Sequence, residues 1–277
     1  MYSFIFSLLF AALSALAAYI NLLSMPWVIT AGVVGFFVAL ILMGRFVVKR
    51  SAPVQEELKR VMEVGQNRIQ RDIQHFQSKP GAGPKAVQMQ IERKKKAMLQ
   101  EVLPVVDKLK PFKKYSALMG RQISTMKMQF HYQLNEFDKV DEILAQRNFF
   151  SKPILNQPML VGMKMARLYK KKDFDGVEKT FKRHLIWFRG EQASLLYGVL
   201  SWVYVKQGKM DEAQAILAKG KEKTGHETLE RNWEAIANGN PKKFNNRGLG
   251  DEWYALGLEN PPQPKAQRMR GKAAHRF

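Results

Sequence analysis

Two apolar runs open the chain. Residues 4–23 contain no charged side chain, and residues 27–44 contain none either. A helix needs about 20 apolar residues to cross the hydrocarbon core of a bilayer. The short link between the runs contains Pro26, which is favourable at the start of a helix. Residues 1–50 therefore predict a hairpin of two transmembrane helices.

Basic residues follow the second run and predict its orientation. Arg45, Lys49 and Arg50 stand at its end, and such residues stay on the cytoplasmic side of a membrane. Both termini are therefore expected in the cytoplasm of a multi-pass protein, in a bacterial inner membrane. A cleaved signal peptide is one alternative, but the N-terminus lacks a basic segment and a second apolar run follows at once. A single span with a re-entrant segment is a second alternative.

The pattern becomes amphipathic after the apolar runs. Between Val54 and Phe76, apolar residues recur at steps of three and four among charged ones, which is typical of a helix with one apolar face. The prolines and glycines of residues 78–85 end this helix, and a second one begins near Ala86. This loop lacks the phosphate-binding pattern of a P-loop. Residues 51–123 therefore predict juxtamembrane amphipathic helices.

Three later stretches share one pattern, namely residues 126–146, 161–183 and 197–217. Each has an apolar helical segment, a short break and a second apolar helical segment. The breaks fall at Asn135-Glu136-Phe137, Lys172-Asp173-Phe174 and Gly208-Lys209-Met210. Repeats of this length, roughly 35 residues, are typical of helical solenoids.

The third stretch resembles the tetratricopeptide repeat (TPR), a family of paired helices. The matching positions are Tyr197, Leu200, Ser201, Tyr204, Gly208, Ala213 and Leu217. The looser matches are Met165, Leu168, Val177 and Phe181 in the second stretch, and Met128, His131, Val140 and Leu144 in the first. The resemblance covers residues 124–225. It implies an α-solenoid over residues 124–246, with a closing helix near its end and a groove that binds a partner protein.

Residues 247–277 follow the repeats. A short helix is expected to begin at Asp251 and to carry Trp253 and Tyr254, which either fold back onto the repeats or dock a partner. Residues 261–277 are proline-rich and then basic, which predicts a disordered tail.

Charge adds candidate binding residues. The chain carries 45 Lys and Arg against 24 Asp and Glu, a net charge of +21, which favours acidic proteins, anionic lipid or nucleic acid. For an acidic protein partner, the candidates are Lys164, Arg167, Lys170 and Lys171 in the middle repeat, together with Trp253 and Tyr254. For anionic lipid or nucleic acid, they are Arg93, Lys94, Lys95, Lys96, Arg268, Arg270 and Lys272.

No catalytic or metal-binding pattern stands out. The histidines are scattered, and the chain has no cysteine, which excludes disulfides and thiolate metal sites. We therefore expect no enzyme, cofactor or metal. The sequence predicts an all-α, membrane-anchored adaptor that binds protein partners at the cytoplasmic face. The alternative is a membrane tether for nucleic acid or ribosomes.

Overall fold

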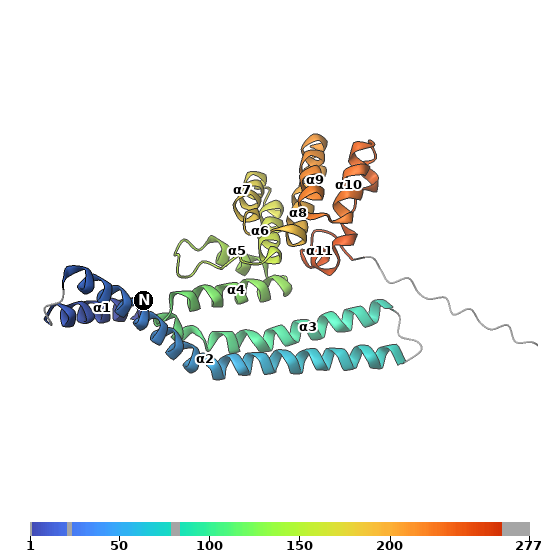
Figure 1. Cartoon of the computed structure of the whole chain (residues 1–277). Coiled ribbons are helices and arrows are strands. Elements are labelled where there is room, and N and C mark those ends of the chain that lie inside the picture. The colour runs from blue at the N-terminus through green and yellow to red at the C-terminus, as the bar shows by residue number, and fades with distance from the viewer. Residues whose placement is uncertain (1, 21–23, 79–83, 262–277) are drawn as a thin grey trace, which may run out of the picture.

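The computed structural model describes residues 2–20, 24–78 and 84–261, and these residues form helices and no strand (Figure 1). This confirms the predicted all-α class. The α-helices are α1 Tyr2–Ile20, α2 Met25–Ser78, α3 Pro84–Asp107, α4 Ala117–Gln133, α5 Phe137–Ala145, α6 Pro158–Lys170, α7 Phe174–Leu185, α8 Ser194–Lys206, α9 Met210–Thr224, α10 Glu227–Ala237 and α11 Asp251–Ala255. The short 3-10 helices are η1 Lys110–Lys114, η2 Gly190–Ala193, η3 Pro241–Lys243 and η4 Arg247–Leu249.

Helix α1 packs along the first part of α2. Small residues lie at this contact, since a Cβ at Gly32 would lie 3.4 Å from the Cβ of Ala15, and such residues allow close approach of helices. Most large apolar side chains of α1 and of the apolar part of α2 are exposed. Among the described residues, Met25–His75 is the one helical stretch that is long and apolar enough to cross a membrane, and Phe4–Ile20 is a shorter apolar helix.

Helix α2 does not end where the sequence pattern changes. The expected domain boundary between residues 50 and 51 falls inside one helix of 54 residues, which also contains Pro53. Figure 1 shows α2 bending between its apolar and amphipathic parts. A bend is the usual result of an internal proline, because its ring clashes with the preceding turn and it donates no hydrogen bond. Pro104 likewise lies inside α3 instead of ending it.

The amphipathic part of α2 packs against α3, and α4 packs on α3. Their apolar faces form a first core, which we call the juxtamembrane core. Its buried members are Val47, Met98, Leu99, Val102, Val106, Leu109, Met119, Ile123, Phe130 and Leu134. This core joins the end of the apolar part of α2 to the rest of the chain.

The remaining helices pack in consecutive pairs, α4 with α5, α6 with α7 and α8 with α9, and α10 packs on α9. Each pair turns at a residue with positive φ: Asn135 at 61°, Lys172 at 61° and Gly208 at 75°. Their side chains form a second core, the C-terminal core. Helix α4 contributes Met128 and Tyr132 to this core and other residues to the juxtamembrane core. The expected domain boundary between residues 123 and 124 therefore falls inside one helix.

The burial of α4 gives a stability prediction. Met128 is fully buried, whereas Leu118 on the same helix is 58% exposed. We expect Met128→Ala to lower the free energy of unfolding by about 2–5 kcal/mol, because it leaves a cavity in the C-terminal core. Leu118→Ala is the control and should change the free energy of unfolding by about 0.5 kcal/mol or less. Denaturant unfolding in detergent, followed by circular dichroism, measures both, and equal effects would contradict the assignment of these two faces.

Candidate functional site

The chain covers its own α4, α6 and α8 on one side, which we call the inner face. The hydroxyl of Tyr132 on α4 donates to the carbonyl of Leu256 at 2.6 Å. The side chain of Leu256 also lies against Gly162 of α6. On α8, the amide of Asn246 donates to the carbonyl of Gly198 at 2.9 Å. The segment 245–259 therefore occupies the face where the sequence led us to expect a groove.

Two tryptophans and one carboxylate fix the end of this segment. Glu259 accepts hydrogen bonds from the indole of Trp202 at 2.7 Å and from the indole of Trp253 at 3.0 Å. The side chain of Trp253 is completely buried, and Tyr254 packs against the same core. Trp253 therefore folds back into the core, the first of the two alternatives given above, and is not among the residues available to a partner. Sequence reasoning missed Glu259, because nothing in its local pattern distinguishes it from a surface acid.

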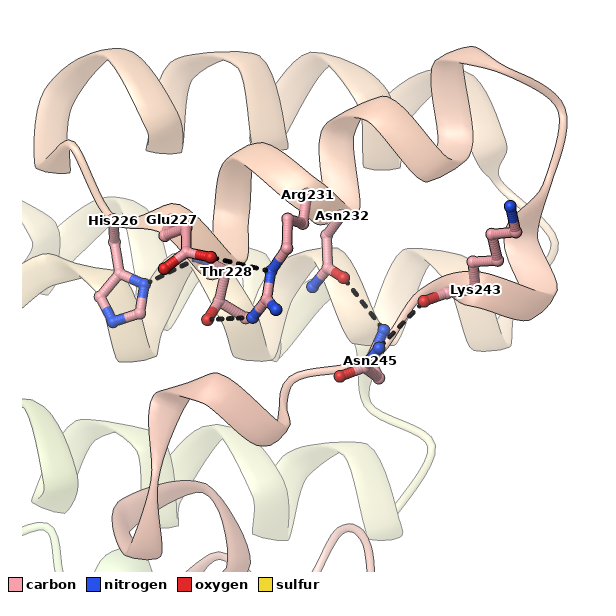
Figure 2. Close-up of polar contacts among 7 residues, drawn as sticks. All are labelled: His226, Glu227, Thr228, Arg231, Asn232, Lys243 and Asn245. Atoms are coloured by element: carbon pink, nitrogen blue, oxygen red, sulfur yellow. Dashed lines mark hydrogen bonds and ion pairs between the residues drawn. The ribbon is translucent and has the colours of Figure 1, made fainter.

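A polar network holds the start of the same segment against α10 (Figure 2). The side-chain oxygen of Asn232 accepts from the backbone N–H of Asn245 at 3.0 Å. The amide nitrogen of Asn232 donates to the side chain of Asn246 at 2.8 Å, and both asparagines are buried. At the start of α10, the ring of His226 accepts from the backbone N–H of Thr228 at 3.2 Å. These contacts close the helix stack, so we assign them a structural role.

Two of the four basic candidates on α6 are held inside the chain. Arg167 donates to both carboxylate oxygens of Asp141 on α5, at 3.0 and 2.7 Å, and its guanidinium lies 4.5 Å from the ring centre of Phe137. Lys171 lies 3.1 Å from the same carboxylate. Burial raises the pKa of Asp141, but the hydrogen bonds from these two cations outweigh it, so the pKa lies below its usual range. Arg167 and Lys171 therefore link α6 to α5.

The other two candidates on α6 are differently placed. Lys170 is exposed. Lys164 is half-buried, and burial, followed by the neighbouring charges of Lys152 and Arg183, lowers its pKa. Lys152 and Arg183 therefore add positive charge near Lys164.

Exposed apolar side chains follow α7, shortly after Arg183. Ile186 and Trp187 follow the end of α7 and are 69% and 74% exposed. Arg183 is exposed on the last turn of the same helix. We call Lys164, Arg183, Ile186 and Trp187 the basic-aromatic edge. Exposed tryptophan and arginine are typical of residues that dominate protein-binding energy, and sequence reasoning had missed all but Lys164.

The basic run on α3 faces solvent. Arg93, Lys95 and Lys96 are exposed, and Lys94 forms an ion pair with Asp72 of α2. The tail candidates Arg268, Arg270 and Lys272 lie outside the described residues. Within residues 2–20, 24–78 and 84–261, no group of three or more His, Asp or Glu could hold a metal ion.

Comparison with protein families, with curated proteins and with solved structures finds no match to this chain. The function proposed below therefore rests on the residues and contacts of the chain itself.

The ion pairs of Asp141 predict a pH-dependent contribution to stability. Its folded-state pKa is lowered, so the carboxylate stabilises the fold above its unfolded-state pKa, and this contribution is lost as the pH falls through the folded-state pKa. We expect Asp141→Asn to lower the free energy of unfolding by about 1–3 kcal/mol at neutral pH. In acid, the unfolding free energies of the variant and of the unmodified protein should become more similar. Unfolding free energies measured between neutral and acidic pH test this.

The control is Glu63→Gln, which removes the exposed ion pair of Glu63 with Lys59. This substitution should change the unfolding free energy by about 0.5 kcal/mol or less at any pH. A cost of Asp141→Asn that does not change with pH would contradict an ionic contribution.

Proposed function

We propose that this protein is a membrane-anchored adaptor with a TPR-like helical solenoid, and that it binds an acidic protein partner at the basic-aromatic edge. The observation that carries the proposal is the exposure of Ile186 and Trp187 shortly after Arg183, a cation that acts on Lys164. These side chains belong to a helical stack that is joined to an apolar hairpin. An aromatic and aliphatic centre flanked by cations complements a partner with an apolar anchor and acidic neighbours.

Three helix pairs with equivalent turns support the solenoid. The turn residues Asn135, Lys172 and Gly208 have nearly the same backbone conformation, and they recur at the interval expected for paired-helix repeats. Successive pairs also contact one another, since α6 packs on α8 and α7 on α8. A stack of this kind buries a continuous core while leaving the ends and connecting loops free for binding.

The outward-facing apolar side chains of α1 and α2 support the anchor. Phe4, Leu13, Phe37 and Ile41 are among the exposed residues, and such a surface is stable in hydrocarbon but not in water. In the proposal, α1 and the first part of α2 form a two-span hairpin with both termini in the cytoplasm. The basic residues that follow, beginning at Arg45, determine that orientation.

A first experiment tests the anchor. The full chain and a chain that lacks residues 1–50 are expressed in parallel, and membranes are washed at high salt and at alkaline pH. We expect the full chain to stay with the membrane pellet and the shortened chain to lose that resistance to extraction, because its apolar hairpin is gone. Release of the full chain by either wash would contradict the proposal.

A second experiment tests the partner site. Partners are captured on the purified full chain in detergent, and their affinity is compared for the unmodified protein and the double variant Trp187→Ser with Arg183→Glu. We expect the affinity to fall by about tenfold or more, because the variant loses an anchor side chain and reverses a flanking charge. Lys219→Glu on α9 is the matched control, since Lys219 is exposed and far along the stack.

An unchanged affinity for the double variant, with the control also unchanged, would move the partner site away from the basic-aromatic edge. The exposed cations Arg93, Lys95 and Lys96 favour the second candidate function, a tether for nucleic acid. That function requires RNA or DNA binding that weakens steeply with salt and is reduced when these three cations are replaced by glutamine.

A further inference from the structure

A second exposed apolar surface lies where α4 begins. Leu118 in the first turn of α4 is 58% exposed, and Phe149 and Phe150 in the connection between α5 and α6 are 62% and 44% exposed. The connection lies directly on the helix, because a Cβ at Gly120 would lie 2.5 Å from the carbonyl oxygen of Phe150. We call Leu118, Phe149 and Phe150 the 118–150 patch.

This patch lies next to the end of the apolar hairpin. The ring of Tyr115, just before α4, lies 6.0 Å from the ring of Tyr2 at the start of α1 and 6.4 Å from the ring of Phe46 on α2. Figure 1 shows the start of α4 and the α5–α6 connection on the side of the molecule where α1 lies. Tyrosine side chains gather at the boundary between hydrocarbon and headgroups. The rings of Tyr2 and Tyr115 therefore mark the level of the membrane surface.

An apolar cavity joins the patch to α2. Its volume is about 950 Å³, and it lies between the stretch of α2 that follows the apolar run and the first turns of α4. Val47 and Val48 line it on the side of α2, and Leu118 and Met119 line it on the side of α4. Polar side chains, among them Gln55 and Glu63, line the cavity as well, and the apolar residues Val48 and Leu118 connect α2 with one member of the patch.

The charge around the patch is positive. The guanidinium of Arg121 lies 4.5 Å from the ring centre of Phe149, and its Nε donates to the carbonyl of Lys152 at 3.3 Å. Arg147 and Lys152 are exposed in the same connection, which contains no acidic residue between 146 and 157. Bulky apolar side chains that are surrounded by cations are typical of segments that lie in an anionic membrane surface.

We propose that the 118–150 patch inserts into the headgroup region of the anionic cytoplasmic leaflet and forms a second membrane contact. This inference rests on the proposed anchor, because the hairpin fixes the level of the bilayer. The contact would hold the helical stack in one orientation on the membrane. The contact would thus act together with the packing of α4 in determining which surfaces of the stack face a partner.

The cysteine-free chain permits a direct test with single fluorescent labels. Phe149→Cys reports on the patch, Phe37→Cys reports on the apolar part of α2, and Lys219→Cys on α9 is the aqueous control. Each full-length variant is labelled with an environment-sensitive dye and reconstituted into vesicles that contain phosphatidylglycerol. Lipids brominated near the headgroup quench labels at the surface, and lipids brominated deep in the chain quench labels in the hydrocarbon.

We expect shallow bromines to quench the label at 149 and deep bromines to quench the label at 37, while the label at 219 keeps its full fluorescence. In vesicles of neutral phosphatidylcholine, quenching at 149 should decrease and quenching at 37 should stay the same, because the cations no longer have anionic partners. Leu118→Cys gives an independent label on the same patch and should behave like the label at 149.

Several outcomes would overturn the inference, and they separate it from the proposed anchor. If the label at 37 is quenched while those at 149 and 118 match the label at 219, the anchor stands and the second contact fails. If the label at 37 is also unquenched, the anchor itself fails. Shielding of the label at 149 in detergent, increasing with protein concentration, would assign the patch to a second copy of the chain and overturn the lipid contact.

Discussion

Helix α4 must bury residues on two sides at once, and the rest of the structure depends on this. Met119, Ile123 and Phe130 enter the juxtamembrane core, while Met128 and Tyr132 enter the C-terminal core. A helix that is apolar on both sides is stable only when both sides are covered. Helices α2 and α3 and the helical stack are therefore joined through one packed element and not through a flexible linker.

The sequence predicted the all-helical class, because periodicity of apolar residues is a local signal. It placed breaks at Asn135, Lys172 and Gly208, and the structure has positive φ at each of them. It failed where a local signal was overridden by packing. Proline disfavours helix interiors, yet Pro53 and Pro104 lie inside helices whose neighbouring turns are held by the juxtamembrane core.

The candidate site was harder to predict, because side-chain availability depends on contacts between distant segments. Arg167 reads as a free cation in sequence but lies in an ion pair with Asp141, 26 positions earlier. For Trp253 the sequence left both a docking and a core role open, and the structure buries it with Trp202 against Glu259. Conversely, Trp187 stands in an apolar stretch that reads as core, and it is among the most exposed large side chains.

The closed inner face has a kinetic and energetic consequence for any foreign peptide. The segment 245–259 is covalently attached to the stack, so its effective local concentration is on the order of millimolar or higher. A competitor would have to displace the indole of Trp253 and the hydrogen bond between Tyr132 and Leu256 before gaining any contact of its own. Exchange at that face would be slow and would favour the tethered segment, so recognition is directed to the loops and edges of the stack.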